Sequence, residues 1–274
     1  MDERSTLSRL IPANQPTDEP LFGQRPQFYI PVAKPTFTWL LLGSNVAVFI
    51  ITVIFGLIQF GGSDFLSNQL PTLVIFGAKV NELIAQGQIW RLFTATFLHA
   101  DILHLVFNLY ALIALGKHIE GYFGHGRFLV IYVLAGLWGS LASYLTSPEI
   151  SVGASGAIFG LAGAAAVYFW RFRENFGDAG RAILRNVLAV IALNLFFGFT
   201  NPQIDNAGHI GGLIGGALVA VGMLPIYHKP DTIQIGNQPL QETHRLALEI
   251  AWAMGHLGLL WLSINFVTQR MLSG

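Results

Sequence analysis

The sequence predicts an all-α polytopic membrane protein, built as a bundle of apolar helices that cross a bilayer. Hydrophobic residues make up 53% of the 274 residues and charged residues only 11%, against roughly 25% charged residues in a typical soluble domain. The mean hydropathy is +0.55. Glycine is frequent, at 30 residues, as expected where helices pack closely in lipid.

Seven apolar stretches supply the helices of this bundle, since about 20 apolar residues cross a membrane core. They lie at 36–60, 90–116, 127–147, 155–172, 182–200, 206–227 and 247–268. The loop 61–89 between the first two is long, and its apolar middle, 70–76, is too short to span. We expect that middle part at the outer interface, or dipping into the membrane under cover of protein. A cytoplasmic linker, 229–246, precedes the last stretch.

The remaining composition narrows the possible partners. The formal net charge is zero, so we expect no nucleic acid partner, because such binding needs clustered basic residues. Cysteine is absent, which excludes disulfides, thiolate zinc sites and cysteine nucleophiles. Residues 1–35 show no signal peptide, and we interpret them as a flexible cytoplasmic N-terminal tail.

The orientation follows from lysine and arginine, which gather in cytoplasmic loops. With the N-terminus inside, 12 of the 15 basic residues fall in inner segments and 3 in outer segments. The inner ones are Arg4, Arg9, Arg25, Lys34, Lys117, Arg127, Arg171, Arg173, Arg181, Arg185, Lys229 and Arg245, and the outer ones are Lys79, Arg91 and Arg270. Seven spans then place the C-terminus outside. We expect a bacterial plasma (inner) membrane, because the loops are compact and no transit peptide is present.

A serine and a histidine lie at the same end of two of these stretches. Gly153-Ala154-Ser155-Gly156 opens the fourth stretch, and His209 lies about one turn into the sixth. Both stretches start on the outer side, so the two side chains share one depth. Histidine is a common activator of a serine nucleophile, because it takes the hydroxyl proton during attack. The pair therefore indicates a protease that works inside the membrane, if the two helices touch.

Rows of small residues give these helices the means to touch. Gly156, Gly160 and Ala164 recur every four residues on the fourth stretch, and Gly208, Gly212 and Gly216 do so on the sixth. Such rows let helix backbones approach closely. Either row alone is explained by helix packing. Together, each beside one member of the serine–histidine pair, they favour contact between the two helices.

A dyad is predicted rather than a triad. The nearest carboxylates, Asp205 and Glu149, lie in outer loops, so no acid is evident that would orient His209. Phe159, one turn below Ser155, is placed to stack against His209 and hold its ring.

The second stretch carries further polar residues. His104 and Asn108 are four apart, hence on one helical face, and with the Ser155 backbone N–H they could stabilise an oxyanion. Ordinary bonding between helices is the alternative for Asn108. His99 is expected to line a wet outer cavity. A metal site formed by His99, His104 and His209 is another interpretation, but no intramembrane carboxylate or cysteine completes it.

Five short motifs in order resemble one family, the rhomboid intramembrane serine proteases. They are Trp90-Arg91, His104-x-x-x-Asn108, the turn 116–124 followed by Arg127-Phe128, Gly153-Ala154-Ser155-Gly156, and Ala207-Gly208-His209 followed by paired glycines. The match covers about 36–228, which resembles the six-helix catalytic membrane domain. The segment 247–274 is similar to the added helix of the six-plus-one arrangement, with a short outer tail.

The resemblance implies a role for each matching residue. Ser155 would be the nucleophile and His209 the general base, while His104 and Asn108 would stabilise the oxyanion. Gly153 would shape the substrate-binding backbone together with its neighbours Ala154 and Gly156. The family often has tyrosine where this chain has Phe159, which keeps the stacking and loses a hydroxyl. The bulky segment 195–199 and the loop after it would gate lateral access to the site.

The predicted function is hydrolysis of peptide bonds in or near transmembrane segments, close to the extracytoplasmic side. Single-pass membrane proteins are the expected substrates and lipid the expected surroundings, and no cofactor or metal is required. The sequence does not fix the oligomeric state. Two alternatives are a non-catalytic rhomboid-like binder of membrane proteins and a transporter. The first typically lacks the serine or histidine, and the second often shows internal repeats that we do not find here.

Overall fold

The computed structural model describes residues 27–60, 69–201, 204–233 and 236–273. The predicted tail thus lies largely outside the described residues, as does part of the first loop. The described residues form two compact units, 27–30 with 227–241, and 31–226 with 242–273. In the smaller unit, β1 (Gln27–Tyr29) pairs in parallel with β3 (Asn237–Pro239), with Phe28 opposite Gln238. Two further short strands, β2 (Tyr227–His228) and β4 (Gln241–Glu242), follow α9 and precede α10 in the chain.

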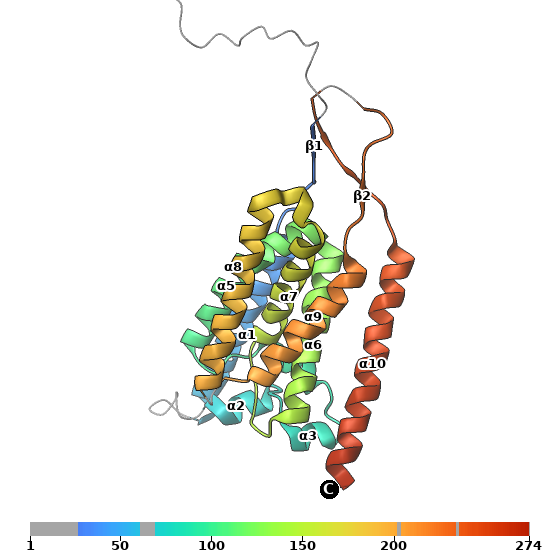
Figure 1. The fold of residues 1–274 in the computed structure, drawn as a ribbon. Helices are drawn as coiled ribbons and strands as arrows, with labels where there is room; N and C mark the ends of the chain where they lie inside the picture. Colours follow the sequence, from blue (N-terminus) through green and yellow to red (C-terminus); the bar gives the residue numbers. More distant parts are fainter. Residues whose placement is uncertain (1–26, 61–68, 202–203, 234–235, 274) are drawn as a thin grey trace, which may run out of the picture. The chain divides into compact units, whose positions relative to one another are not determined.

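The larger unit is entirely helical apart from its loops and Glu242 of β4 (Figure 1). Its helices are α1 (Thr36–Phe60), α2 (Gln69–Ile75), α3 (Asn81–Ala85), α4 (Arg91–Thr94), the 3-10 turn Ala95–Phe97, α5 (Ile102–Phe123), α6 (His125–Thr146), α7 (Ser155–Arg171), α8 (Arg173–Thr200), α9 (Asn206–Met223) and α10 (Leu246–Ser273). Within the described residues, six are long and apolar enough to cross a membrane: α1, α5, α6, α8 from Phe176 on, α9 and α10. The predicted all-α polytopic membrane fold is confirmed.

The shortest of the predicted spans, α7, is surrounded by other helices. It has 17 residues and packs against α5, α6, α8 and α9 (Figure 1). Ten of its residues are buried, which is why its apolar stretch need not match the full membrane thickness by itself.

The second span begins later than the sequence predicts. Residues 90–101 do not continue α5 outward; they form α4, the 3-10 turn and an extended link through Leu98. Asp101 ends this segment, and its carboxylate accepts a hydrogen bond from the His104 N–H at 2.8 Å. An N-cap of this kind fixes the start of a helix regardless of how apolar the preceding residues are.

Glycine lines the interface of α6, α7 and α9. A Cβ added to Gly139 of α6 would lie 2.7 Å from the Gly208 carbonyl oxygen and 3.3 Å from the Gly156 Cα. One turn deeper, a Cβ on Gly160 would lie 3.4 Å from the Gly216 Cα. The two small-residue rows therefore meet, as predicted, and bring the backbones of α7 and α9 into direct contact.

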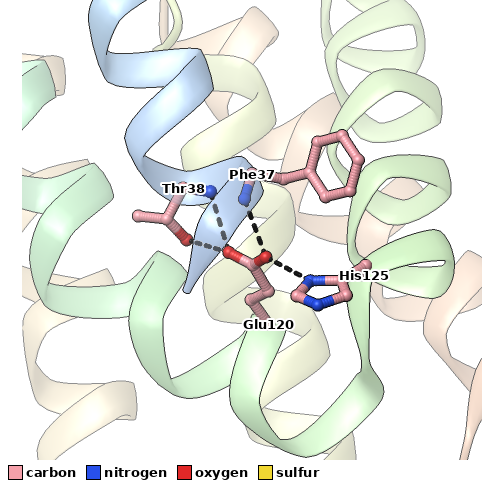
Figure 2. A network of polar contacts seen from close by, with 4 residues as sticks. All are labelled: Phe37, Thr38, Glu120 and His125. Carbon is pink, nitrogen blue, oxygen red and sulfur yellow. Dashed lines mark hydrogen bonds and ion pairs between the residues drawn. The ribbon is translucent and has the colours of Figure 1, made fainter. Parts of the chain in front are cut away.

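A buried carboxylate attaches the start of α1 to the end of α5 (Figure 2). Glu120 is 0% exposed, and its oxygens accept hydrogen bonds from the N–H groups of Phe37 and Thr38, each at 2.8 Å. The Thr38 hydroxyl donates a third bond at 2.7 Å, and the His125 ring lies at 2.6 Å. Glu120 thus satisfies N–H groups of the first turn of α1 that have no acceptor within that helix.

We expect Glu120→Ala to lower the free energy of unfolding by about 2 kcal/mol or more, because it leaves buried donors of α1 without an acceptor. His125→Ala is the matched control, since it removes one bond from a side chain that is 44% exposed. Thermal unfolding of the purified variants in detergent measures both effects. Equal losses in the two variants would contradict the capping role of Glu120.

The first loop is attached to the end of α6 by a buried lysine. Lys79 is 0% exposed, and its ammonium donates to the carbonyls of Ser147 at 2.6 Å and Glu149 at 2.9 Å. Its backbone pairs with Ser151 through two hydrogen bonds, at 3.0 and 3.2 Å. Arg91, at the start of α4, donates to the carbonyls of Val74 and Ala78 in this loop. The described part of the loop, 69–89, is therefore packed against the rest of the unit.

Lys79 gives a pH-dependent prediction. Burial lowers its pKa from 10.5 to about 8, although nearby carboxylates, Asp205 foremost, act in the opposite direction. Between pH 8 and 10.5 the unfolded chain binds more protons at this residue than the folded chain, so stability rises with pH across this window. Thermal unfolding at several pH values in the window measures the rise, and Lys79→Met should lack it. A rise of equal size in Lys79→Met would refute the assignment.

The last helix, α10, is held by polar contacts along its length. At its start, Arg127 pairs with Glu249 at 2.7 Å and also with Glu242. Further along, the Trp138 indole N–H donates to His256 Nδ1 at 3.1 Å. Near its end, a hydrogen bond of 3.0 Å joins the hydroxyls of Tyr144 and Thr268. These contacts attach α10 to α6 at three levels.

Candidate active site

A glycine with positive φ lies two residues before the start of α7. Gly153 has φ +128°, a conformation that L side chains rarely adopt. Its N–H donates to the Ala95 carbonyl at 2.9 Å, and a Cβ there would lie 2.7 Å from His104 Nε2. Ala154 is fully buried and precedes the helix without a side-chain cap. The N–H groups of the first turn of α7 therefore have no acceptor within the helix or from a capping side chain.

The Ser155 hydroxyl meets the His209 ring across the glycine interface. His209 Nε2 lies 2.9 Å from Ser155 Oγ, although 54 residues separate them in the chain. The Phe159 ring stacks on the face of the His209 ring, with 4.3 Å between the ring centroids and an angle of 12° between the planes. The tautomer with its proton on Nδ1 leaves Nε2 free to accept the Ser155 hydrogen. The predicted contact of the two helices and the predicted stacking are both present.

Within the described residues, His209 Nδ1 has no hydrogen-bond partner, so no carboxylate among them orients the imidazole. Asp205, the nearest candidate, uses its carboxylate oxygens elsewhere: Oδ1 accepts from the Gly208 N–H at 2.8 Å and Oδ2 accepts from Ser151 Oγ at 2.6 Å. The ring is held by Ser155 on one edge and by Phe159 across its face.

Two polar residues of α5 lie toward the start of α7. His104 Nε2 faces the Cα of Gly153, two residues before the serine. Asn108 is buried, and its amide donates to the His104 carbonyl at 3.0 Å. An amide has two N–H donors, so one donor of Asn108 is left for another acceptor. The structure thus brings residues of α5, α7 and α9 to one place.

His99 does not line an open cavity, contrary to the sequence-based prediction. It is 1% exposed and meets the His104 ring edge to face, with 5.2 Å between centroids. Burial, together with the proximity of His104, lowers the pKa of His99 to about 4, so the ring stays neutral at physiological pH. The prediction failed because His99 lies before α5 rather than on that helix, and its ring is buried against His104. Its contact supports the ring of His104.

Sequence reasoning missed the link between Ser151 and Asp205. Both residues lie in loops, and both line one small cavity together with Ser155, Gly156 and Gly208. A signal for Asp205 was present, since aspartate directly before a predicted helix is a common N-cap. No sequence pattern pairs it with Ser151. Among the described residues, no group of three or more His, Cys, Asp or Glu side chains is placed to hold a metal ion.

Comparison with known proteins gives a consistent assignment. The Rhomboid domain model matches residues 86–226, a range that includes every predicted site residue from His99 to His209. The chain is 46% identical over 190 residues to the rhomboid protease GluP of Bacillus subtilis (strain 168), covering 69% of this chain and 35% of that protein. It is 34% identical over 228 residues to RHOMBOID-like protein 5 of Arabidopsis thaliana, covering 73% and 72%. It is also 32% identical over 220 residues to the rhomboid protease AarA of Providencia stuartii, covering 71% and 74%.

Proposed function

This chain belongs to the rhomboid family of intramembrane serine proteases, and we propose that Ser155 and His209 are the catalytic dyad with which it hydrolyses peptide bonds. The match covers about a third of the length of GluP and nearly three quarters of the other two relatives. The observation that carries the proposal is the 2.9 Å contact between Ser155 Oγ and His209 Nε2.

The proposed reaction proceeds in two steps. His209 Nε2 takes the Ser155 proton as Oγ attacks the carbonyl carbon of the scissile bond. The tetrahedral intermediate collapses when the C–N bond breaks, and His209 returns the proton to the leaving amine. A water molecule, deprotonated by His209, then attacks the acyl-enzyme ester. The second tetrahedral intermediate collapses when the bond between the carbonyl carbon and Ser155 Oγ breaks. The acid product is released, and His209 returns the proton to Ser155 Oγ.

The negative oxygen of the tetrahedral intermediate needs donors that are already in place. The Ser155 N–H at the start of α7 is one candidate, because the helix provides no acceptor for it. The His104 ring and the free amide donor of Asn108 are the others, and both come from α5. Gly153, Ala154 and Gly156 would shape the backbone that receives the substrate.

We expect Asn108→Ala to lower kcat by on the order of 10-fold or more, because it removes a donor to the oxyanion. Asn265→Ala is a matched control: its amide makes the same bond to the carbonyl four residues earlier in its own helix, at 2.7 Å, on the exposed side of α10. Initial cleavage rates at saturating substrate measure the effect. Similar rates for the two variants would leave Asn108 with a structural role alone.

Single-pass membrane proteins are the proposed substrates. A transmembrane helix hides its carbonyls in internal hydrogen bonds, so the cleaved segment must unwind locally before Ser155 can attack. Helix-breaking residues near the bond would lower that cost. The outer part of α8 carries the exposed side chains Phe196, Phe197 and Phe199, and we propose that it gates lateral access. Residues 202–203 of the following loop lie outside the described residues.

The protein is an integral multi-pass membrane protein. We propose that it lies in a bacterial inner membrane with its N-terminus in the cytoplasm and its C-terminus outside. The excess of lysine and arginine in the inner segments supports this orientation, and it puts Ser155 and His209 on the extracytoplasmic side.

The test of the proposed function uses the purified full chain in detergent, a single-span substrate and a fluorophosphonate serine probe. We expect cleavage, and we expect mass spectrometry to locate the probe on Ser155. Substrate binding without cleavage or labelling would favour a non-catalytic binder. Solute flux in liposomes without either activity would favour a transporter.

A further inference from the structure

Asp205 determines where the helix of His209 begins. It directly precedes α9, and its carboxylate Oδ1 accepts from the Gly208 N–H at 2.8 Å. Its backbone carbonyl accepts from the His209 N–H at 3.1 Å. The first turn of α9, which presents His209, is therefore attached to Asp205 through both its side chain and its backbone.

The other carboxylate oxygen of Asp205 extends to the segment that leads into the nucleophile. Oδ2 accepts from Ser151 Oγ at 2.6 Å, across 54 residues of chain. Ser151 is itself fixed, because its backbone pairs with Lys79 in both directions. Two residues further on, Gly153 is held by its bond to Ala95. One carboxylate thus joins the start of α9 to an anchored segment four residues before Ser155.

This connection matters because of how the rest of the interface is packed. Beside the stack of Phe159 on His209, α7 and α9 meet along glycines such as Gly156 and Gly212, where backbone lies against backbone. Such packing brings helices close but resists sliding or rotation less than interlocked side chains do. A shift of about 1 Å between catalytic groups can cost on the order of 100-fold in rate. A polar bond at the outer end opposes that shift.

We propose that Asp205 is a positioning residue that holds the start of α9 against the Ser151 segment and so keeps His209 within reach of Ser155. This inference rests on the proposed function. Asp205 does not act as the acid of a triad, because both its oxygens are engaged and His209 Nδ1 has no hydrogen-bond partner within the described residues. Its effect is on the distance and angle between nucleophile and base.

The test compares four variants of the full chain. Asp205→Ala should lower kcat by on the order of 10- to 100-fold while KM changes by less than about 2-fold, because the carboxylate oxygens of Asp205 bond to Gly208 and Ser151. Asp205→Asn should restore most of the rate: its oxygen still accepts from Gly208, and its amide can donate to Ser151 Oγ. Ser151→Ala should lower kcat by a smaller factor, since only the bond between the loops is lost. Glu149→Ala, which removes an exposed acid from the same outer loop, should keep the wild-type rate.

The labelling rate of Ser155 and the comparison of Asp205→Asn with Asp205→Ala separate a positioning role from loss of folding and from failure of the proposed function. The labelling rate of Ser155 by the fluorophosphonate probe should fall in Asp205→Ala, and adding Ser151→Ala should lower it little further, because Asp205→Ala already breaks the bond between Ser151 and Asp205. A folded Asp205→Asn as slow as Asp205→Ala would show that the charge itself acts, and an unchanged kcat in Asp205→Ala or Ser151→Ala would overturn the inference. Absence of cleavage and labelling in the wild type would instead refute the proposed function.

Discussion

Ser155→Ala is expected to abolish cleavage, with kcat lower by on the order of 10⁴-fold or more. Alanine has no hydroxyl to form the acyl-enzyme, and the chain offers no cysteine that could replace it. The change is small and removes the hydroxyl that bonds to His209. Thermal unfolding should therefore stay close to that of the wild type.

His209→Ala should cause a loss of similar size, because without a base the Ser155 hydroxyl keeps its proton at neutral pH. The double variant should be no slower than either single one, since the two side chains act as a unit. Ser44→Ala on α1 and His118→Ala on α5 are matched controls; both side chains are exposed, and each bonds to a carbonyl four residues earlier in its own helix. Release of the cleaved fragment, measured over several hours, provides the range needed. Activity within about 10-fold of the wild type in either dyad variant would contradict the mechanism.

The helices could be predicted because segments that cross lipid must be mostly apolar, but the ends of the helices depend on hydrogen bonding rather than on hydropathy. The apolar run through Phe97 and Leu98 reads as part of the second span, yet α5 begins only at Ile102. Hydropathy measures transfer into lipid. A helix start depends on which group accepts the N–H groups of the first turn, and here the Asp101 carboxylate accepts that of His104. A single polar residue therefore overrides the apolar residues before it.

The Ser155–His209 pair could be predicted because a pattern within each helix points to it. Each residue adjoins a row of small residues at helical spacing, and the two rows together favour close contact between the helices. The bonds of Lys79 to Ser147 and of Asp205 to Ser151 join loops that are 68 and 54 residues apart. No periodicity within one segment encodes such pairs. The burial of His99 escaped prediction likewise, because it depends on tertiary packing around a residue that precedes α5.

Gly212→Ala is expected to be the most damaging of the small substitutions outside the dyad. A Cβ on Gly212 would lie 2.9 Å from the Gly156 Cα and would overlap the carbonyl of the same residue. The obstacle is backbone on both sides, so no side chain can rotate away. The two helices must separate near the first turn of α7, directly beside the contact between Ser155 and His209. We therefore expect kcat to fall by on the order of 100-fold and the free energy of unfolding to fall by about 1–3 kcal/mol.

Gly258→Ala on α10 isolates the effect of the clash from that of helix propensity. A Cβ there meets nothing within 4 Å, so the substitution should leave kcat unchanged. It should also stabilise the fold slightly, since alanine favours a helix over glycine by up to about 1 kcal/mol. The same chemical change thus has opposite expected signs at the two positions, and thermal unfolding with cleavage rates measures both. If Gly212→Ala behaved like Gly258→Ala, α7 and α9 could not be in backbone contact, and the geometry that unites Ser155 with His209 would lose its support.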